Sequence, residues 1–185
     1  MAVDDAARWD SRYAGHAIAS PRPPDVVESS DLLDIVPGAG RALDVACGAG
    51  AQSVWMAQRG LEVVAIDASP AAIDLTTSAA GAAGVGERVE VRVVDLDRGI
   101  PSELGNFDVI VCQRFRGVDL YDSFITRLRP GGLCIVTVLS RTGAASPGAF
   151  HAAPRELLTA FTRPDAEILL HTERDGQESV VARTA

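Results

Sequence analysis

Three aspartates, each at the end of an apolar run, are the residues whose types and spacing indicate chemistry. Asp44 ends a short apolar run, Asp67 ends residues 61–67, and Asp95 ends residues 89–95. In an open parallel sheet, ligands bind beyond the carboxyl ends of the strands. We therefore expect the three carboxylates to gather at one ligand-binding edge.

The stretch after Asp44 predicts a turn against which a ligand lies. Gly48 and Gly50 carry no Cβ, so a ligand can approach the backbone and the turn can adopt a positive φ. A helix is expected directly afterwards, and its first N–H groups and positive dipole end point at the same place. A strand, a glycine turn and a helix N-terminus in this order are typical of a cofactor site.

The position of Asp44 helps to choose between two classes of cofactor. A dinucleotide places its diphosphate on the helix N-terminus, where Asp44 would repel it. S-adenosylmethionine instead carries an ammonium and a sulfonium group and no phosphate. The dinucleotide pattern G-x-G-x-x-G also fails at its third glycine, which is Ser53 here. The residues therefore favour S-adenosylmethionine, with an NAD(P)-dependent oxidoreductase as the alternative.

The other two aspartates suit the remaining parts of such a cofactor. Asp67 falls 17 residues after Gly50, where a carboxylate can accept two O–H bonds from a ribose. Hydrogen bonds to a charged acceptor contribute about 1.5–3 kcal/mol each. Asp95 is placed to accept from an adenine amino group, and the N–H of Leu96 to donate to the ring. Ribose occurs in both cofactor classes, so Asp67 does not separate them.

Apolar runs alternate with helical patterns from about residue 37 onward, which predicts an α/β fold with a parallel sheet covered on both faces. Strands are expected from Arg41 and over residues 61–67, 89–95, 107–112 and 132–139, with helices over residues 25–36, 51–59, 70–80, 118–129 and 154–161. Residues 167–171 and 179–184 flank a turn at Asp175-Gly176 and predict an antiparallel pair. We expect one globular unit, with a helical lid segment at residues 1–36 (helix at 4–14) and a cofactor-binding domain at residues 37–185.

Composition restricts the function classes. The chain has 185 residues, 47% of them hydrophobic, and a net charge of −8, which argues against binding to nucleic acid or to an anionic membrane. Cys47, Cys112 and Cys134 lie in or beside apolar runs without a C-x-x-C pair, so reduced thiols are expected. The N-terminus lacks the pattern of a signal peptide, and no apolar run approaches the roughly 20 residues of a membrane span. A cytoplasmic protein is therefore expected.

Several motifs together resemble one enzyme family. The chain resembles the class I S-adenosylmethionine-dependent methyltransferases, and is most similar to the small bacterial group that includes the tellurite-resistance methyltransferases. Residues 44–50 resemble the first family motif, with Ala46 where glycine is usual, and residues 65–70 resemble the second. The resemblance extends to the segment Trp9–Tyr13, which closes over the cofactor in such enzymes, and to residues 94–96, 107–111, 128–132 and 155–158.

The resemblance implies a Rossmann-like, doubly wound, three-layer fold with seven mostly parallel strands, the last of them antiparallel. It implies that Asp44 faces the methionine amino group, that Asp67 holds the ribose, and that Arg12 and Tyr13 reach the methionine carboxylate. The expected cofactor contacts are Trp9, Arg12, Tyr13, Asp44, Ala46, Cys47, Gly48, Gly50, Asp67, Ala68, Asp95, Leu96, Cys112 and Gln113.

The acceptor side of the reaction is expected near the end of the 107–112 strand. Methyl transfer is an in-line displacement, so positioning can supply roughly 7–11 kcal/mol of the barrier. Arg114 is the first catalytic candidate, and with Arg116 it is suited to hold an anionic acceptor, while Phe115 and Tyr121 suit an apolar floor. His151 is the candidate base, needed only if the acceptor loses a proton.

No metal-ligand set is visible in the sequence, which disfavours metal-dependent transfer. We therefore expect a methyltransferase acting on a small molecule. A nicotinamide-dependent oxidoreductase and a non-catalytic protein that binds S-adenosylmethionine stay open as alternatives.

Overall fold

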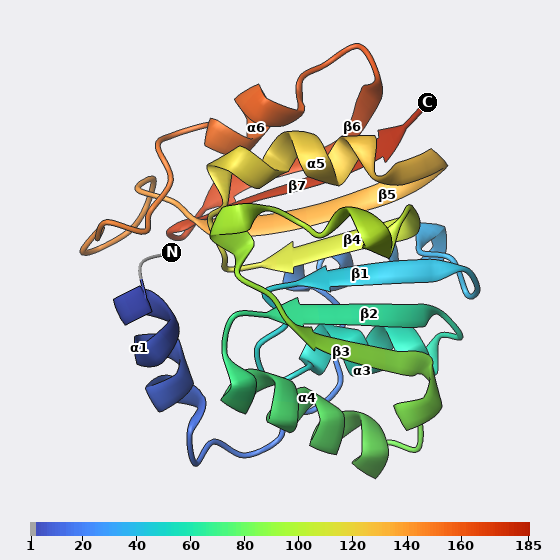
Figure 1. The fold of residues 1–185 in the computed structure, drawn as a ribbon. Coiled ribbons are helices and arrows are strands. Elements are labelled where there is room, and N and C mark those ends of the chain that lie inside the picture. The colour runs from blue at the N-terminus through green and yellow to red at the C-terminus, as the bar shows by residue number, and fades with distance from the viewer. Residues whose placement is uncertain (1–2) are drawn as a thin grey trace.

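One seven-stranded sheet organises the protein, and its strands follow the order β3-β2-β1-β4-β5-β7-β6 (Figure 1). The computed structural model describes residues 3–185, with side chains from residue 8 onward. The strands are β1 (Arg41–Val45), β2 (Glu62–Asp67), β3 (Val89–Val93), β4 (Phe107–Gln113), β5 (Leu128–Leu139), β6 (Ala166–Arg174) and β7 (Gln177–Thr184). The first five are parallel, whereas β7 runs antiparallel to both of its neighbours. The predicted fold class is confirmed.

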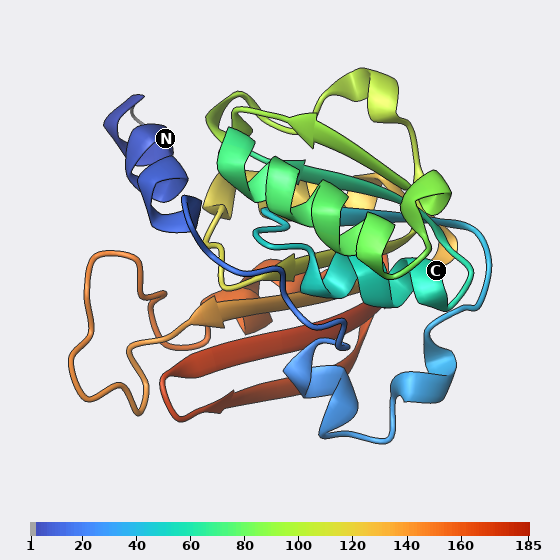
Figure 2. The same ribbon diagram turned by 90° about the horizontal axis from the view of Figure 1, so that it is seen from below.

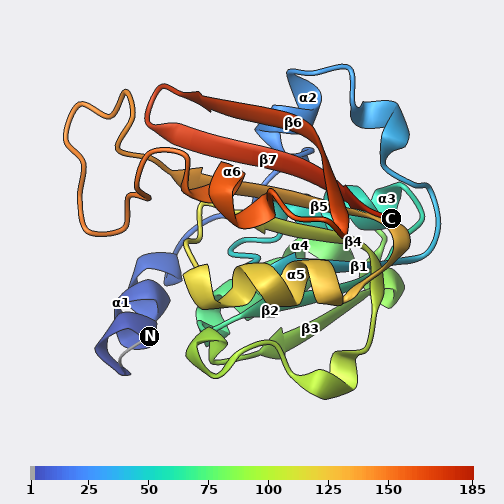
Figure 3. The same cartoon turned by 90° about the horizontal axis from the view of Figure 1, so that it is seen from above.

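Helices cover both faces of the sheet. They are α1 (Val3–Tyr13), α2 (Asp25–Glu28), α3 (Ala51–Gln58), α4 (Pro70–Ala82), α5 (Tyr121–Thr126) and α6 (Glu156–Phe161). One hydrophobic cluster joins α5 and α6 to the sheet, and a second joins α2 and α3 to its other face. Figure 1 shows α5 and α6 in front of the sheet, and Figure 3 shows the same layers from above.

Strand alternation in β1 fixes where its carboxylate points. Leu43 and Val45 pack in the cluster of α5 and α6, whereas Ala42 packs in the cluster of α2 and α3. Because successive side chains of a strand point to opposite faces, Asp44 shares the face of Ala42 and lies towards α3. The pattern of the strand thus places this acid at the start of the helix that follows the glycine turn.

The expected helix over residues 25–36 is wrong. The chain forms only α2 there, followed by turns and a 3₁₀ helix at Leu33–Ile35. Ser30 donates its hydroxyl to the carbonyl oxygen of Val26 at 2.6 Å, which is the local bonding by which serine competes with helix continuation. Apolar residues in this segment pack on the core from irregular backbone instead.

Two other boundaries also differ. The expected helix over residues 118–129 is shorter in the structure: a 3₁₀ turn precedes α5, and α5 ends at Thr126. Strand β5 begins at Leu128, because Leu128 already pairs with Phe107 of β4. Strand β3 ends at Val93 rather than Asp95, whose carboxylate accepts a bond from the N–H of Asp97 and caps a 3₁₀ helix.

Two segments flank the carboxyl ends of the parallel strands. Helix α1 packs against α4, and the loop of residues 140–155 follows β5. Figure 2 shows both at the same end of the sheet. The division into a lid segment of residues 1–36 and a domain of residues 37–185 stays a prediction. Among the residues that the structure describes, no helix has the length and hydrophobicity needed to cross a membrane.

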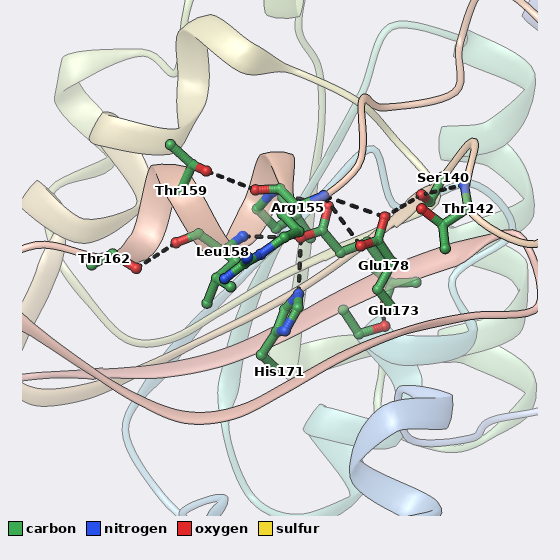
Figure 4. A network of polar contacts seen from close by, with 12 residues as sticks. Ser140, Thr142, Arg155, Leu158, Thr159, Thr162, His171, Glu173 and Glu178 are labelled. Carbon is green, nitrogen blue, oxygen red and sulfur yellow. Dashed lines mark hydrogen bonds and ion pairs between the residues drawn. The ribbon is translucent and has the colours of Figure 1, made fainter.

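A buried glutamate fixes α6 to the last strands. Glu178 of β7 is fully buried, and its two carboxylate oxygens accept bonds from the N–H groups of Leu157 and Leu158, both at 3.0 Å. His171 Nε2 lies 3.0 Å from the same carboxylate, and Glu173 accepts a bond from the hydroxyl of Ser140 at 2.6 Å (Figure 4).

Within the described part of the chain, one group of side chains has the residue types and spacing of a metal site: His171, Glu173 and Glu178. Its carboxylate oxygens already accept bonds from backbone and hydroxyl donors. We interpret the group as the attachment of α6 and of the 140–155 loop to the sheet rather than as a metal site.

Candidate active site

The turn between β1 and α3, residues 46–50, which we call the cofactor turn, bends through left-handed backbone. Ala46, Gly48 and Gly50 have φ values of 57°, 56° and 81°. A Cβ on Gly50 would lie 2.9 Å from Thr76 Oγ1 and 3.0 Å from its Cα, so this glycine lets the turn pack on α4. Left-handed backbone costs about 1–2 kcal/mol for an L-residue, which explains why glycine is usual where this chain has Ala46.

Asp44 lies beneath this turn as a buried carboxylate with a single side-chain partner. Its side chain is 2% exposed and accepts a hydrogen bond from Ser53 Oγ at 2.5 Å. Burial raises the pKa of Asp44 to about 7; hydrogen bonds from the hydroxyl and the backbone N–H of Ser53 oppose this shift, and the nearby charge of Asp67 adds to it. A buried carboxylate with so few donors gains most from a neighbouring cation.

Asp67 joins the two halves of the site. Its Oδ2 accepts from the N–H of Gly48 at 3.0 Å, and its Oδ1 accepts from the N–H of Ser69 at 2.9 Å. Burial raises the pKa of Asp67, while these backbone bonds lower it. Each oxygen keeps a lone pair for a further donor. Ala68 follows Asp67 and is half-buried.

Helix α1 brings two predicted aromatic residues to the cofactor turn. A Cβ on Gly48 would lie 2.7 Å from the hydroxyl oxygen of Tyr13, so the tyrosine lies directly against this glycine. Burial raises the pKa of Tyr13 to about 12, and the negative charge of Asp67 adds to the shift. Trp9 stacks on Tyr13 with 6.3 Å between ring centroids, and the guanidinium of Arg12 lies 5.3 Å from the Trp9 ring centroid.

Asp10 is a residue of the site that the sequence prediction missed. Its Oδ1 accepts from the hydroxyl of Ser69 and from the N–H of Ala71, both at 2.8 Å. These bonds, that of Ala71 first, hold the pKa of Asp10 below its usual range. Ser69 caps α4 by accepting from Ala72, so α1 contributes a second cap to the same helix. The unsatisfied N–H groups at the start of α4 were the available signal.

The two residues predicted to contact the adenine differ in how far they are buried. Leu96 is buried, whereas the side chain of Asp95 is about half exposed and lies 3.5 Å from the guanidinium of Arg98.

Two cysteines expected at the site are also buried. Cys47 lies 3.6 Å from the hydroxyl of Thr76, and Cys112 lies 3.6 Å from the carbonyl oxygen of Phe115. Burial raises the pKa of both thiols, so neither is a ready nucleophile.

A cavity of about 820 Å³, which we call the edge cavity, opens beyond the carboxyl ends of β3, β4 and β5. Helix α1 contributes Arg8, Trp9 and Arg12, and the 140–155 loop contributes Phe150. The remaining lining comes from residues 96–99 and 114–120, Ser123 and Leu139. The volume falls within the range of small-molecule pockets.

The structure separates the acceptor-side candidates. Arg114 lines the edge cavity, and so does Arg116, although Arg116 makes two bonds to the Glu156 carboxylate at 2.8 and 2.7 Å. Gln113 folds back and donates to the carbonyl oxygens of Cys112 and Ile135. His151 is not among the residues that line the cavity, and its Nδ1 accepts from the N–H of Gly148 at 2.9 Å.

Comparison with known proteins agrees with this architecture. Residues 42–132 match the family described as a methyltransferase domain. A ubiquinone biosynthesis O-methyltransferase of Xanthomonas axonopodis pv. citri is 32% identical over 114 residues, which cover 59% of this chain and 47% of that protein. The chain thus spans about half the length of this curated relative.

Two solved structures share the fold over nearly the whole chain. TehB from Haemophilus influenzae has a TM-score of 0.73 at 18% identity, covering 96% of this chain and 67% of TehB. A geranyl diphosphate C-methyltransferase from Streptomyces coelicolor A3(2), solved with S-adenosyl-L-homocysteine, has a TM-score of 0.70 at 13% identity, covering 98% of this chain and 97% of that one.

Fold, cofactor turn and family match point the same way. Residues 42–132 match a methyltransferase-domain family, in agreement with the resemblance to class I S-adenosylmethionine-dependent methyltransferases, and the chain shares its fold with TehB. S-adenosylmethionine is the cofactor of this class, and the residues present fit it: a buried carboxylate short of donors lies beneath a glycine turn that a tyrosine covers.

Proposed function

We propose that the protein transfers a methyl group from S-adenosylmethionine to a small-molecule acceptor. The observation that carries the proposal is the convergence of Asp44 and Asp67 on the cofactor turn beneath Tyr13. When bound, the cofactor supplies an electrophilic methyl group and leaves as a neutral thioether. The protein therefore has to bind and orient both molecules and exclude water.

The roles of the cofactor residues follow from their surroundings. Asp44 binds the methionine ammonium, because an ionised and buried carboxylate needs a cation. Asp67 accepts the ribose hydroxyls while its backbone bonds hold it in place. Tyr13 and Arg12 reach the methionine carboxylate from the lid, and Trp9 closes over them. Ala68 contacts the adenine face, and Asp95 and Leu96 contact its edge.

The remaining predicted contacts shape the same pocket. Ala46, Cys47, Gly48 and Gly50 present backbone to the cofactor, and Cys112 and Gln113 form the end of β4 beneath it. Arg114 orients the acceptor in the edge cavity, which it lines. His151 is kept as the candidate base for an acceptor that loses a proton; its loop borders the cavity through Phe150.

Calorimetric titration with S-adenosylhomocysteine, with NAD as the control, tests the cofactor assignment. We expect micromolar binding of S-adenosylhomocysteine and no binding of NAD. Binding of NAD alone would establish the oxidoreductase alternative. Normal cofactor affinity without release of S-adenosylhomocysteine on any acceptor of a broad panel would favour the non-catalytic alternative.

We further propose that the protein works in the cytoplasm on a freely diffusing small molecule rather than on nucleic acid or a membrane. The net charge of −8 and the three buried free cysteines support this proposal. In a filter-binding assay at low salt we expect no retention of DNA or RNA. Retention of either nucleic acid would contradict the proposal.

A further inference from the structure

The edge cavity brings several arginines together in an acidic protein. Five arginines line it (Arg8, Arg12, Arg98, Arg114 and Arg116), against two aspartates, Asp97 and Asp119. Carboxylates outside the lining lie near three of these arginines: Glu156 at 2.7 Å from Arg116, Asp95 at 3.5 Å from Arg98 and Asp25 at 3.8 Å from Arg114. An anionic ligand is therefore bound best by a guanidinium whose N–H groups are not held by such a neighbour.

Among these arginines, Arg114 is well placed to bind such an anion. Arg116 is already held by two bonds to Glu156, and Arg98 lies near Asp95. The nearest carboxylate oxygen to Arg114 belongs to Asp25, at 3.8 Å, beyond hydrogen-bond distance. Asp25 also accepts a bond from Arg22 at 3.0 Å, so its charge is already shared.

The backbone fixes Arg114 directly after the last residue of β4. Arg114 has a φ of 60°, and its N–H donates to the carbonyl oxygen of Thr137 at 2.7 Å. Left-handed backbone at a residue other than glycine is costly and concentrates at functional sites. The backbone of Arg114 is therefore fixed between the ends of β4 and β5, beside the cavity that this residue lines.

Aromatic rings give the same cavity flat apolar surfaces. Trp9 of the lid, Phe115 after β4 and Phe150 of the 140–155 loop all line it. Phe150 is 51% exposed, and the guanidinium of Arg8 lies 5.0 Å from its ring centroid. Large exposed apolar side chains beside a cavity are suited to a ligand with a planar or apolar body.

We infer that the methyl acceptor is a small aromatic or apolar molecule bearing an oxyanion, and that Arg114 binds this oxyanion in the edge cavity. The identification of this ligand as the methyl acceptor rests on the proposed function. The preference of the cavity for such anions, in contrast, is testable without turnover. A guanidinium binds carboxylate, sulfonate and phosphate oxygens through the same charge-assisted bonds, so the oxyanion chemistry is common to these groups.

Two fluorescent probes with one ring system measure the preference directly. 8-Anilinonaphthalene-1-sulfonate carries an oxyanion, and N-phenyl-1-naphthylamine is its neutral counterpart. Both are titrated into the protein saturated with S-adenosylhomocysteine. We expect the sulfonate to bind at least about tenfold tighter than the neutral probe, from charge-assisted hydrogen bonding.

Variants assign the preference to Arg114. Arg114→Gln should weaken sulfonate binding about tenfold and leave binding of the neutral probe within about twofold, and Arg114→Lys should give an intermediate loss. Arg174→Gln is the matched control, since Arg174 is an exposed arginine outside the cavity lining. Folding of each variant is checked by its thermal unfolding midpoint.

Equal binding of the two probes, no binding of the sulfonate, or an unchanged sulfonate affinity in Arg114→Gln would overturn the inference. Failure of S-adenosylhomocysteine to bind would instead contradict the proposed function. The probe titrations are then run on the free protein, so the two failures remain distinguishable.

Discussion

Two buried carboxylates, Asp44 in β1 and Glu178 in β7, differ in how many donors they receive. Glu178 accepts from two backbone N–H groups and lies 3.0 Å from His171, whereas Asp44 receives its bonds from the hydroxyl and the N–H of one residue, Ser53, and its pKa is still raised to about 7 by burial. A carboxylate satisfied by backbone donors holds the fold together. One left short of donors costs stability and is suited to a bound cation.

Replacing Glu178 by alanine should have the largest effect on stability. The change leaves the N–H groups of Leu157 and Leu158 without an acceptor in a buried setting. Unsatisfied buried groups cost about 1–3 kcal/mol each, so a loss of about 3 kcal/mol in the free energy of unfolding is expected from denaturant titration. The affinity of the folded protein for S-adenosylhomocysteine should not change. A large loss of affinity would contradict the view that Glu178 is a purely structural carboxylate.

Asp67 has features of both carboxylates and should show both effects. It accepts from the N–H groups of Gly48 and Ser69, yet burial raises its pKa. Asp67→Ala should lower the free energy of unfolding by about 2 kcal/mol and weaken binding of S-adenosylhomocysteine at least about tenfold. Denaturant titration and calorimetry measure the two effects separately, and unchanged affinity would remove the ribose assignment.

Asp44→Asn should separate function from stability. Because the folded pKa of Asp44 lies above its ordinary value of 3.8, the folded state binds the proton more tightly than the unfolded state. The stability contributed by the protonated form is therefore lost as pH rises from about 4 to about 7. At pH 8 the asparagine variant should melt higher than the parent protein, yet bind S-adenosylhomocysteine at least about tenfold more weakly. A lower melting temperature would place Asp44 with Glu178 as a structural carboxylate.

The smallest effect is expected at Asp10, a half-buried carboxylate whose bonds fix α1 to α4. Asp10→Ala should weaken binding of S-adenosylhomocysteine by about threefold, since helix capping is a modest interaction and Ser69 remains as a cap. Asp74→Ala, at an exposed aspartate of α4, is the control. An equal effect of both changes would show that Asp10 has no special part in holding the lid.

The sequence predicted those parts of the molecule that depend on residues near one another in the chain. The strand patterns, the glycine turn after Asp44 and the start of a helix at residue 70 are all local features, and the structure has them. The prediction of a helix over residues 25–36 was wrong because it followed the spacing of the apolar residues. It gave too little weight to the two serines that follow α2.

Contacts between distant residues could not be predicted in this way. Arg116 is held by Glu156, which lies 40 residues away, and the partners of Asp10 lie about 60 residues away. The same limit applies to Glu178, whose role depends on the start of α6. For the acceptor side, sequence spacing identified Arg114 and Arg116 together, and only the structure separates them.

The most direct test of the central claim is the pH dependence of S-adenosylhomocysteine binding, measured by calorimetry from pH 6 to pH 8. With a pKa of about 7, Asp44 is mostly protonated at pH 6 and mostly charged at pH 8, so affinity should rise about tenfold over this range in the parent protein. In Asp44→Asn the rise should largely disappear. An affinity independent of pH in the parent protein, or the same rise in the variant, would contradict the assignment of Asp44 as the ammonium site.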